Sequence, residues 1–540
     1  MTPQPGKLRI MPPRQKPPNI LLFMLDQLAP QSLPDYGHGL VQTPFLSALA
    51  DKGAVFDNFY CNSALCGPSR SSFMSGRRNS HIGAFDNAAE FPASTPTFAH
   101  YLRNAGYRTC LAGKMHFVGP DQLHGFEDRV TTDIYPGDFG WTPTWDDPGK
   151  VHWWFHNMLS VTEAGPYDRT LEIDYDEDVA YQASRWLWDH ARGKDERPFM
   201  MAVSLMHPHD PYLAPRHLWG RYRDDDVDMP AVPYIPPAKR DPFSARMWKL
   251  YDRDEYEVTE AHIRAARHGY YAMVTYADEL IGRVLEPLQR AGLADDTAII
   301  VTADHGDMLG ERGLWYKMVY FERSVRVPLI VKLPGETKAR RVKQNTSLID
   351  MLPSLVDLAT GGKLPEFAAP VDGASLIPLA RGESPKGWSD TVFGEYLAEG
   401  TIEPVFMIKR GNLKFICAKG DPAQLYDTAA DPNELNNLAL QPSHAMTLAA
   451  LQAEAVKRWD SDAIRARVVA SQKARLLVQD ALLKGRITPW DSEPRIDASK
   501  VYNRNYGGEL YDTDRRARVP YQDEPPKRQR RTRRDWSRDR

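Results

Sequence analysis

PNILLFMLDQ, residues 18–27, is a short apolar run that ends in a carboxylate and an amide side chain. A run of this length is typical of a buried β-strand and is far too short to span a bilayer. Two later segments repeat the pattern, RPFMMAVSLMHPHDPY at 197–212 and DDTAIIVTADHGDMLGE at 295–311. We therefore expect polar side chains to gather where several buried strands end.

Helical patterns lie between these strands, and TPFLSALADKGAVFDNFY (43–60) joins a threonine–proline helix start to a further strand. Strands that alternate with helices predict an α/β fold with a mostly parallel central sheet and helices on both faces. In such sheets, ligands bind at the carboxyl ends of the strands. The sequence therefore predicts that the polar clusters converge on one site.

The composition is that of a globular protein, with 540 residues, 42% hydrophobic and 26% charged residues, and a formal net charge of −3. This charge argues against nucleic acid or an anionic membrane as the main partner. Residues 1–16 are polar and proline-rich without an apolar signal-peptide core, which favours a cytoplasmic protein without a membrane anchor. The four cysteines have neither zinc-site nor disulfide-framework spacing, so reduced thiols are expected.

Composition changes along the chain predict a second, smaller region. VFGEYLAEG, PVFMIKRGNLKFICAKG and QLYDTAADPNELNNLA indicate short antiparallel strands, and the Ala-, Leu- and Arg-rich stretch after them indicates helix. The last residues are strongly basic and predict a solvated tail, with nucleic-acid binding as the less favoured interpretation. The predicted organisation is a disordered start (1–16), a catalytic domain (17–389), an α+β subdomain (390–485), an extended tail (486–515) and a basic disordered end (516–540).

LCGPSRSSFMSGR (65–77) is the most informative segment chemically. Its Cys66, Pro68, Ser69, Arg70 and Gly76 resemble the signature of the formylglycine-dependent sulfatases, which implies an alkaline phosphatase-like fold. In that family a maturation enzyme oxidises the cysteine to formylglycine (3-oxoalanine), whose hydrate attacks sulfur and later releases sulfate by C–O cleavage. The alternative interpretation is a buried structural cysteine beside a turn-forming proline, so the motif depends on its structural context.

Oxygen ligands at strand ends suit a hard divalent cation. The sulfatase resemblance assigns metal binding to Asp26, Gln27, Asp304 and His305, with the modified Cys66 completing the shell. His305 stands where many sulfatases have Asn, which leaves the metal open among Ca²⁺, the expected ion, Mg²⁺ and Mn²⁺. For any single acid the other interpretation is a helix cap or a turn, but the joint pattern favours a metal site.

GKMHFVGP (113–120) carries a lysine and a histidine two residues apart, which point the same way on an extended segment. The resemblance implies that Arg70 and Lys114 orient the formylglycine. It also implies that His116 is the base that breaks the sulfated intermediate.

SLMHPHDPY (204–212) and GLWYKM (313–318) supply a further cation and further proton-transfer groups. By the same resemblance, Lys317 and His207 contact the sulfate and the leaving oxygen, with His207 as the general acid. Cations at this place stabilise the charge that develops on those oxygens. His209 is interpreted as a structural residue.

The resemblance extends to the choline sulfatases and covers the chain from about residue 17 to 510. It rests on GKMHFVGPDQLHGFEDRVTTDIYPGDFGWTP, FDNAAEF, SLMHPHDPY, DHGDMLGERGLWYKM and GRITPWD. A quaternary ammonium cannot donate hydrogen bonds, so its pocket needs aromatic faces and carboxylates. The resemblance places five residues around the trimethylammonium: Asn87, Trp141, His156, Glu395 and Asp491.

The tail of that family reaches into a neighbouring subunit. Asp491 is therefore expected to act in trans within a homo-oligomer, a dimer or a tetramer with exchanged tails. For Trp153 and Trp154 in HWWFHN, core or interface packing is the alternative interpretation, and it is preferred for at least one of the pair.

We therefore predict hydrolysis of a small-molecule sulfate ester, choline-O-sulfate, by a formylglycine made from Cys66 with a divalent metal. A formylglycine-generating enzyme is the implied partner. One alternative is an arylsulfatase or phosphonate monoester hydrolase with the same site. The other is a non-catalytic anion-binding relative in which Cys66 is never oxidised.

Overall fold

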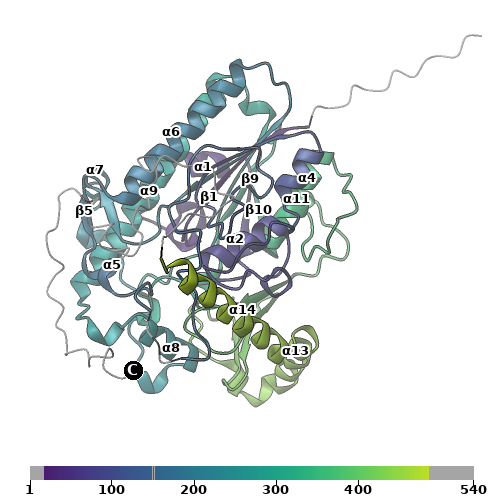
Figure 1. Cartoon of the computed structure of the whole chain (residues 1–540). Coiled ribbons are helices and arrows are strands. Elements are labelled where there is room, and N and C mark those ends of the chain that lie inside the picture. The colour runs from purple at the N-terminus through teal and green to yellow at the C-terminus, as the bar shows by residue number, and fades with distance from the viewer. Residues whose placement is uncertain (1–16, 149, 151, 486–517, 519–540) are drawn as a thin grey trace, which may run out of the picture.

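The computed structural model describes residues 17–148, 150, 152–485 and 518. Its centre is an eight-stranded sheet with the strand order β10-β2-β9-β8-β1-β6-β3-β4 (Figure 1). These strands are β1 (Asn19–Leu25), β2 (Ala54–Tyr60), β3 (Arg108–Gly113), β4 (Asp128–Arg129), β6 (Phe199–Leu205), β8 (Thr297–Ala303), β9 (Leu329–Lys332) and β10 (Arg340–Ser347). Only β9 runs antiparallel to its neighbours in this described sheet. The predicted mostly parallel α/β sheet is confirmed.

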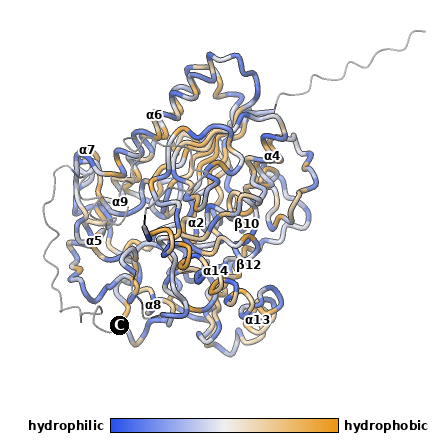
Figure 2. The backbone as a smooth tube through the Cα atoms, viewed as in Figure 1, coloured by the Kyte–Doolittle hydropathy of each residue, from blue (hydrophilic) through white to orange (hydrophobic). Residues whose placement is uncertain are grey.

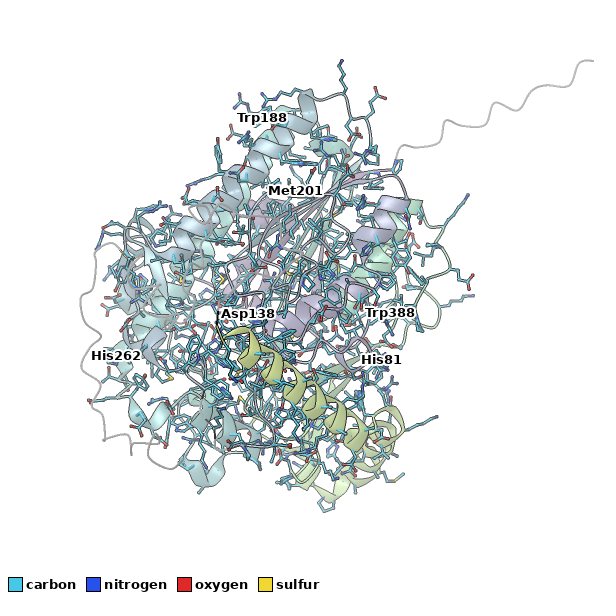
Figure 3. All side chains as sticks on the ribbon, in the orientation of Figure 1. His81, Asp138, Trp188, Met201, His262 and Trp388 are labelled. Atoms are coloured by element: carbon cyan, nitrogen blue, oxygen red, sulfur yellow. The ribbon has the colours of Figure 1, made fainter. Side chains whose placement is uncertain are left out.

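Helices cover both faces of the sheet, as Figure 1 shows. One layer contains α1 (Pro44–Ala50), α6 (Leu171–Arg192) and α9 (Glu260–Arg290), and the other contains α2 (Cys66–Ser75), α4 (Phe98–Asn104) and α11 (Met351–Thr360). Every residue of β1, β6 and β8 is buried, because a parallel strand between two helical layers meets apolar side chains on both sides. Figure 2 shows the apolar segments gathered at this centre, and Figure 3 labels Met201 there and Trp188 towards the outer end of α6.

Short elements connect the main layers. A two-stranded parallel pair, β5 (Gly165–Tyr167) and β7 (Leu213–Pro215), lies against α9. The short helices are α3 (Asn79–Ile82), α5 (Leu159–Thr162), α7 (Arg216–Trp219), α8 (Pro242–Leu250), α10 (Glu322–Val325) and α12 (Ile377–Ala380).

The C-terminal region forms a second sheet, as the sequence predicts. Its antiparallel strands follow one another in chain order: β11 (Thr391–Tyr396), β12 (Val405–Arg410), β13 (Leu413–Ala418) and β14 (Gln424–Asp427). Two helices follow, α13 (Ala445–Arg458) and α14 (Ser461–Leu482), and α14 extends back towards the central body (Figure 1). Their apolar faces share a separate core with the strands, in which the rings of Phe406 and Trp459 stack 4.4 Å apart.

The predicted disordered start (1–16), extended tail (486–515) and basic end (516–540) lie outside the described residues, apart from Arg518. Arg518 is buried, and its Nη1 donates to the Glu163 carboxylate at 2.7 Å. Among the described helices, none is both long and apolar enough to cross a membrane.

Candidate active site

Four neighbouring strands of the central sheet end at one place. In the order β8, β1, β6 and β3, these strands lie side by side. Asp304 follows β8, Asp26 follows β1, and Lys114 follows β3. All three side chains are fully buried and lie within one network of ion pairs. The carboxyl edge of the sheet therefore holds the site, as expected for this fold class.

Gly113 allows Lys114 to enter this network. A Cβ on Gly113 would lie 1.9 Å from the carbonyl oxygen of Ser204 on β6, and its φ of +102° is in the region that favours glycine. Glycine therefore lets the end of β3 approach β6 closely. The next residue, Lys114, forms an ion pair with Asp26 through its ammonium group.

Cys66 is the first residue of α2 and faces the two carboxylates. Its Sγ lies 3.1 Å from Nε2 of His305 and 3.8 Å from Oδ1 of Asp26. Together with Asp304, these residues place one ligand atom each within 4.8 Å of one another. Two buried carboxylates and an imidazole that share a gap have the chemistry and the spacing of a divalent cation site, so Asp26, Asp304 and His305 fit such an ion. Gln27, the fourth predicted ligand, bonds to Lys317 through its side-chain oxygen.

Arg70 holds the outer oxygens of the same carboxylates. Its Nε donates to Oδ2 of Asp304 at 2.8 Å, and its Nη2 donates to Oδ2 of Asp26 at 3.1 Å. The Oδ1 atoms remain directed towards the gap near His305. Because Arg70 lies one turn after Cys66 on α2, the helix fixes the nucleophile position relative to the acids.

Positive charge surrounds the Cys66 sulfur. Burial by itself raises the pKa of a thiol, but Lys114, Lys317 and His305 outweigh it and hold the pKa of Cys66 well below its usual range. The side chain of His116 contributes in the same direction, while its Nε2 donates to the carbonyl oxygen of Asn87 at 3.0 Å. The site is therefore built to stabilise negative charge at this position.

Lys317 lines the same pocket as Cys66 and bonds to Gln27 and to two histidines. Its Nζ lies 2.7 Å from Oε1 of Gln27, 2.6 Å from Nε2 of His209 and 3.3 Å from Nε2 of His156. Burial and the Lys317 charge lower the pKa of His156 to about 3, so its ring is neutral and accepts the bond. Gln27 donates through Nε2 to Asp307 at 2.7 Å, which fixes the direction of its oxygen.

The two histidines of SLMHPHDPY lie in different surroundings. Nδ1 of His207 lies 2.7 Å from Asp176, and its ring packs edge-on against Tyr276, 4.8 Å between centroids. His209 instead lines the pocket above Cys66, and its Nδ1 lies 2.5 Å from the carbonyl oxygen of Asp210. The structure therefore brings the histidine interpreted as structural to the site, and places the predicted general acid against Asp176.

A pocket opens directly beside Cys66 and Lys317. Aromatic rings form much of its wall, with Trp141 and Tyr135 5.1 Å apart and Trp154 stacked 6.2 Å from Trp141. Four of the five predicted substrate residues lie in the described part of the chain, and three of them line this pocket: Asn87, Trp141 and His156. Asp491 lies outside the described residues.

Glu395, the remaining predicted residue, does not line the pocket. Its carboxylate accepts hydrogen bonds from the Ser80 amide at 2.8 Å and from Nε1 of Trp459 at 2.7 Å. Glu399 lines the pocket instead, with one carboxylate oxygen, Oε2, buried and without a hydrogen-bond partner. Burial raises the pKa of Glu399 to about 8, because its effect outweighs the opposing charge of Lys317.

Sequence reasoning missed four further aromatic or acidic residues of the pocket: Tyr135, Glu172, Asp210 and Glu399. Tyr135 lies between β4 and Trp141, and Glu172 is in the first turn of α6. These residues could have been predicted from the carboxylates and aromatic side chains that stand near the quoted motifs.

Comparison with known proteins agrees with this geometry. Residues 18–362 match the family model described as Sulfatase, and residues 310–460 match the one described as N-sulphoglucosamine sulphohydrolase, C-terminal. A crystal structure of the phosphonate monoester hydrolase of Agrobacterium radiobacter has a TM-score of 0.65 and 25% identity, covering 84% of this chain and 96% of that one. The chain belongs to the sulfatase family and is a sulfuric ester hydrolase.

Two further comparisons concern the C-terminal segment and the whole length of the chain. Residues 466–519 match the model described as Choline sulfatase enzyme C terminal. A choline-sulfatase of Rhizobium meliloti (strain 1021) is 45% identical over 496 residues, which are 91% of this chain and 96% of the relative. An N-acetylglucosamine-6-O-sulfatase of Bacteroides thetaiotaomicron is 28% identical over 78% of this chain and 83% of the relative.

Proposed function

We propose that this protein hydrolyses choline-O-sulfate to choline and sulfate. The observation that carries the proposal is the position of Glu399, a buried carboxylate that shares one pocket with Trp141, Cys66 and Lys317. An anionic sulfate would lie against the lysine, and the quaternary ammonium would lie against the ring and the carboxylate. The similarity to a choline-sulfatase supports the same substrate.

We infer that Cys66 is converted to formylglycine, whose hydrate supplies the nucleophile for sulfur, and that a divalent cation, Ca²⁺ in preference to Mg²⁺ or Mn²⁺, supplies charge neutralisation. Asp26, Asp304 and His305 would hold the cation, together with the residue at 66. Gln27 is the remaining proposed ligand, through the same Oε1 that now accepts from Lys317. Arg70 keeps the two carboxylates oriented whether or not the cation is bound.

We assign proton transfer to two histidines of the site, His116 and His209. His116 lies beside Cys66, with one ring nitrogen on the Asn87 carbonyl, so the other is placed to remove a proton at residue 66. His209 lines the same pocket as Cys66, and its Nε2 lies 2.6 Å from Nζ of Lys317, so a proton of the lysine can reach the leaving oxygen through this pair. We assign His209 the protonation of the leaving choline oxygen, in place of His207. Lys317 stabilises the negative charge that develops at sulfate, and Lys114, paired with Asp26, keeps the proposed role of orienting the formylglycine.

The pocket wall is suited to a trimethylammonium group. Each cation–aromatic contact contributes roughly 0.5–2 kcal/mol, and more where water is excluded. Trp141 is mostly buried, so its face is largely shielded from bulk water. A neutral alkyl group of the same shape would gain the apolar contact but neither the ring attraction nor the Glu399 charge. The pocket therefore favours a cationic alcohol as the leaving group.

The proposed function requires oxidation of Cys66 by a second enzyme and includes assembly into an oligomer. We infer a formylglycine-generating enzyme as partner and a homo-oligomer in which the 486–515 tail is exchanged. Exposed apolar side chains on α13 and α14 support assembly, with Met446 at 88%, Val456 at 79% and Leu477 at 71% exposure. All four cysteines are unpaired, which supports the cytoplasm as the compartment.

The direct test compares three esters with the full chain produced together with a formylglycine-generating enzyme. We expect sulfate release from choline-O-sulfate with a higher kcat/KM than from p-nitrophenyl sulfate, and slow hydrolysis of a phenyl phosphonate monoester. A preference for the aryl ester would favour the arylsulfatase alternative. A preference for the phosphonate would favour the activity named for the structure from Agrobacterium radiobacter.

A further inference from the structure

Helix α14 forms hydrogen bonds to two segments that carry residues of the cation pocket and is linked to a third segment through Trp145. Arg475 is buried, and its Nη1 and Nη2 donate to the two oxygens of Asp86 at 2.8 and 2.7 Å. The same Nη1 donates to Oγ1 of Thr142 at 3.0 Å. Asp86 precedes Asn87 and Thr142 follows Trp141, so one guanidinium holds the chain beside two pocket residues.

Gln472 makes the third connection from the same face of the helix, one turn before Arg475. Its Oε1 accepts from the backbone N–H of Trp145 at 2.9 Å. Nε1 of Trp145 in turn donates to the carbonyl oxygen of Ala398 at 2.8 Å, directly before Glu399. The buried carboxylate of the pocket is therefore linked to α14 through one indole.

The connection also reaches the nucleophile. Oδ1 of Asn87 accepts from the backbone N–H of Gly67 at 2.9 Å, and the Asn87 carbonyl accepts from His116 at 3.0 Å. Asn87 thus lies between the pocket and the start of α2. A shift of Asp86 would move Asn87 relative to Cys66, because the two residues are adjacent in the chain.

We propose that Gln472 and Arg475 are positioning residues that clamp the cation pocket, so that α14 sets the selectivity for a cationic alcohol. This inference rests on the proposed function. It also assigns a role to the start of the segment 466–519, which matches the choline sulfatase C-terminal model. Neither residue lines the pocket or touches the reacting atoms. The selectivity arises because the clamp fixes the spacing of Asn87, Trp141 and Glu399.

Figure 3 shows α14 passing the segment that carries the labelled Asp138. The Arg475 guanidinium, the Asp86 carboxylate and the Thr142 hydroxyl are buried and paired with one another, with Asp86 and Thr142 each 1% exposed. A bidentate arginine pair out of water has a fixed geometry, which suits a positioning role better than a surface ion pair would.

The test measures kcat/KM of the converted full-length enzyme for choline-O-sulfate and for p-nitrophenyl sulfate. The ratio of the two values is independent of the fraction of active enzyme, so loss of folding or of conversion does not change it. We expect Arg475→Met to lower this ratio at least about tenfold, mainly through the KM for choline-O-sulfate. Asp462→Asn on the same helix, which removes an exposed ion pair with Lys419, is the matched control and should keep the wild-type ratio.

Loss of Arg475 leaves the Asp86 charge buried and can prevent folding, so Gln472→Met is the second variant. It removes the bond to Trp145 without a change of charge and should lower the ratio in the same direction. A wild-type ratio in either folded variant would overturn the clamp. A wild-type enzyme without preference for choline-O-sulfate would instead overturn the proposed function on which the clamp rests.

Discussion

Nζ of Lys317 lies 2.6 Å from Nε2 of His209, and both side chains line the pocket beside Cys66. The lysine is fully buried and also bonds to Gln27 at 2.7 Å. His209 is therefore tied to the same group that would meet the sulfate. His207, two residues earlier, is tied to Asp176 instead.

His209→Ala is expected to reveal the general acid through its dependence on the leaving group. Loss of a general acid costs roughly 10²–10⁴ in rate for a poor leaving group such as choline. Because p-nitrophenolate leaves without protonation, its sulfate ester should lose far less activity. His207→Ala serves as comparison and should lower thermal stability without this difference. Equal losses for both esters in His209→Ala would contradict the assignment.

Conversion of Cys66 is expected in cells that contain a formylglycine-generating enzyme. Mass spectrometry of the peptide with residues 65–70 should show the lower mass of an aldehyde in place of the thiol. Cys66→Ala should abolish sulfate release, whereas Cys61→Ala, a buried cysteine five positions earlier in the printed sequence, should retain conversion at Cys66. An unshifted peptide in an active enzyme would contradict the formylglycine mechanism.

Chelation should remove both activity and part of the stability. Asp26 and Asp304 are buried with their Oδ1 atoms near each other, so a cation that binds the native state stabilises it by mass action. We expect treatment with EDTA to lower Tm and activity together, and added Ca²⁺ to restore both. An Asp304→Asn variant should show no rise of Tm with Ca²⁺. Full activity after exhaustive chelation would contradict the metal assignment.

Choline binding should tighten as the pH rises. Burial raises the pKa of Glu399 to about 8, so at neutral pH the group is mostly protonated in the free enzyme. A bound cation stabilises the ionised form of Glu399, so the fraction of enzyme molecules that can bind choline well grows with pH. The inhibition constant of choline should therefore fall by about tenfold between pH 7 and 9. The Glu399→Gln variant should bind choline weakly, and its inhibition constant should not change with pH in this way. A choline inhibition constant that rises with pH in the native enzyme would exclude a role of Glu399 in cation binding.

The two glutamates of FGEYLAEG offer a matched pair of variants. Glu399→Gln should lower kcat/KM for choline-O-sulfate by at least about tenfold relative to p-nitrophenyl sulfate, since one charge contact in the pocket is lost. Glu395→Gln should lower Tm, because its carboxylate accepts bonds from Ser80 and Trp459, and should keep the ratio. The opposite result would restore the prediction made from the sequence.

The sequence was sufficient for the fold because its main signals are local. The apolar run before Asp26 and the one before Asp304 each fill a buried strand and end in polar ligands, and both strands are neighbours in the sheet. The motif at Cys66 likewise begins a helix whose Arg70 lies one turn later. Such features depend on residues close in the chain, so pattern and resemblance predict them.

The parts that the sequence could not predict depend on distant contacts. His209 follows a turn in which its N–H bonds to the carbonyl of Met206 at 3.0 Å, so strand alternation no longer fixes which histidine faces the site. Which glutamate of the second sheet faces the pocket depends on how that sheet packs against the first. Trp145, which links Gln472 to Ala398, carries no signal of this role in its local sequence.

The measurement that tests the central claim most directly compares choline-O-sulfate with 3,3-dimethylbutyl sulfate, in which carbon replaces the charged nitrogen. The two esters have the same shape and differ only in the charge at this atom. Cation–aromatic contacts together with the Glu399 charge predict a kcat/KM for choline-O-sulfate about 100-fold higher. Equal values for the two esters would contradict a pocket built for a quaternary ammonium.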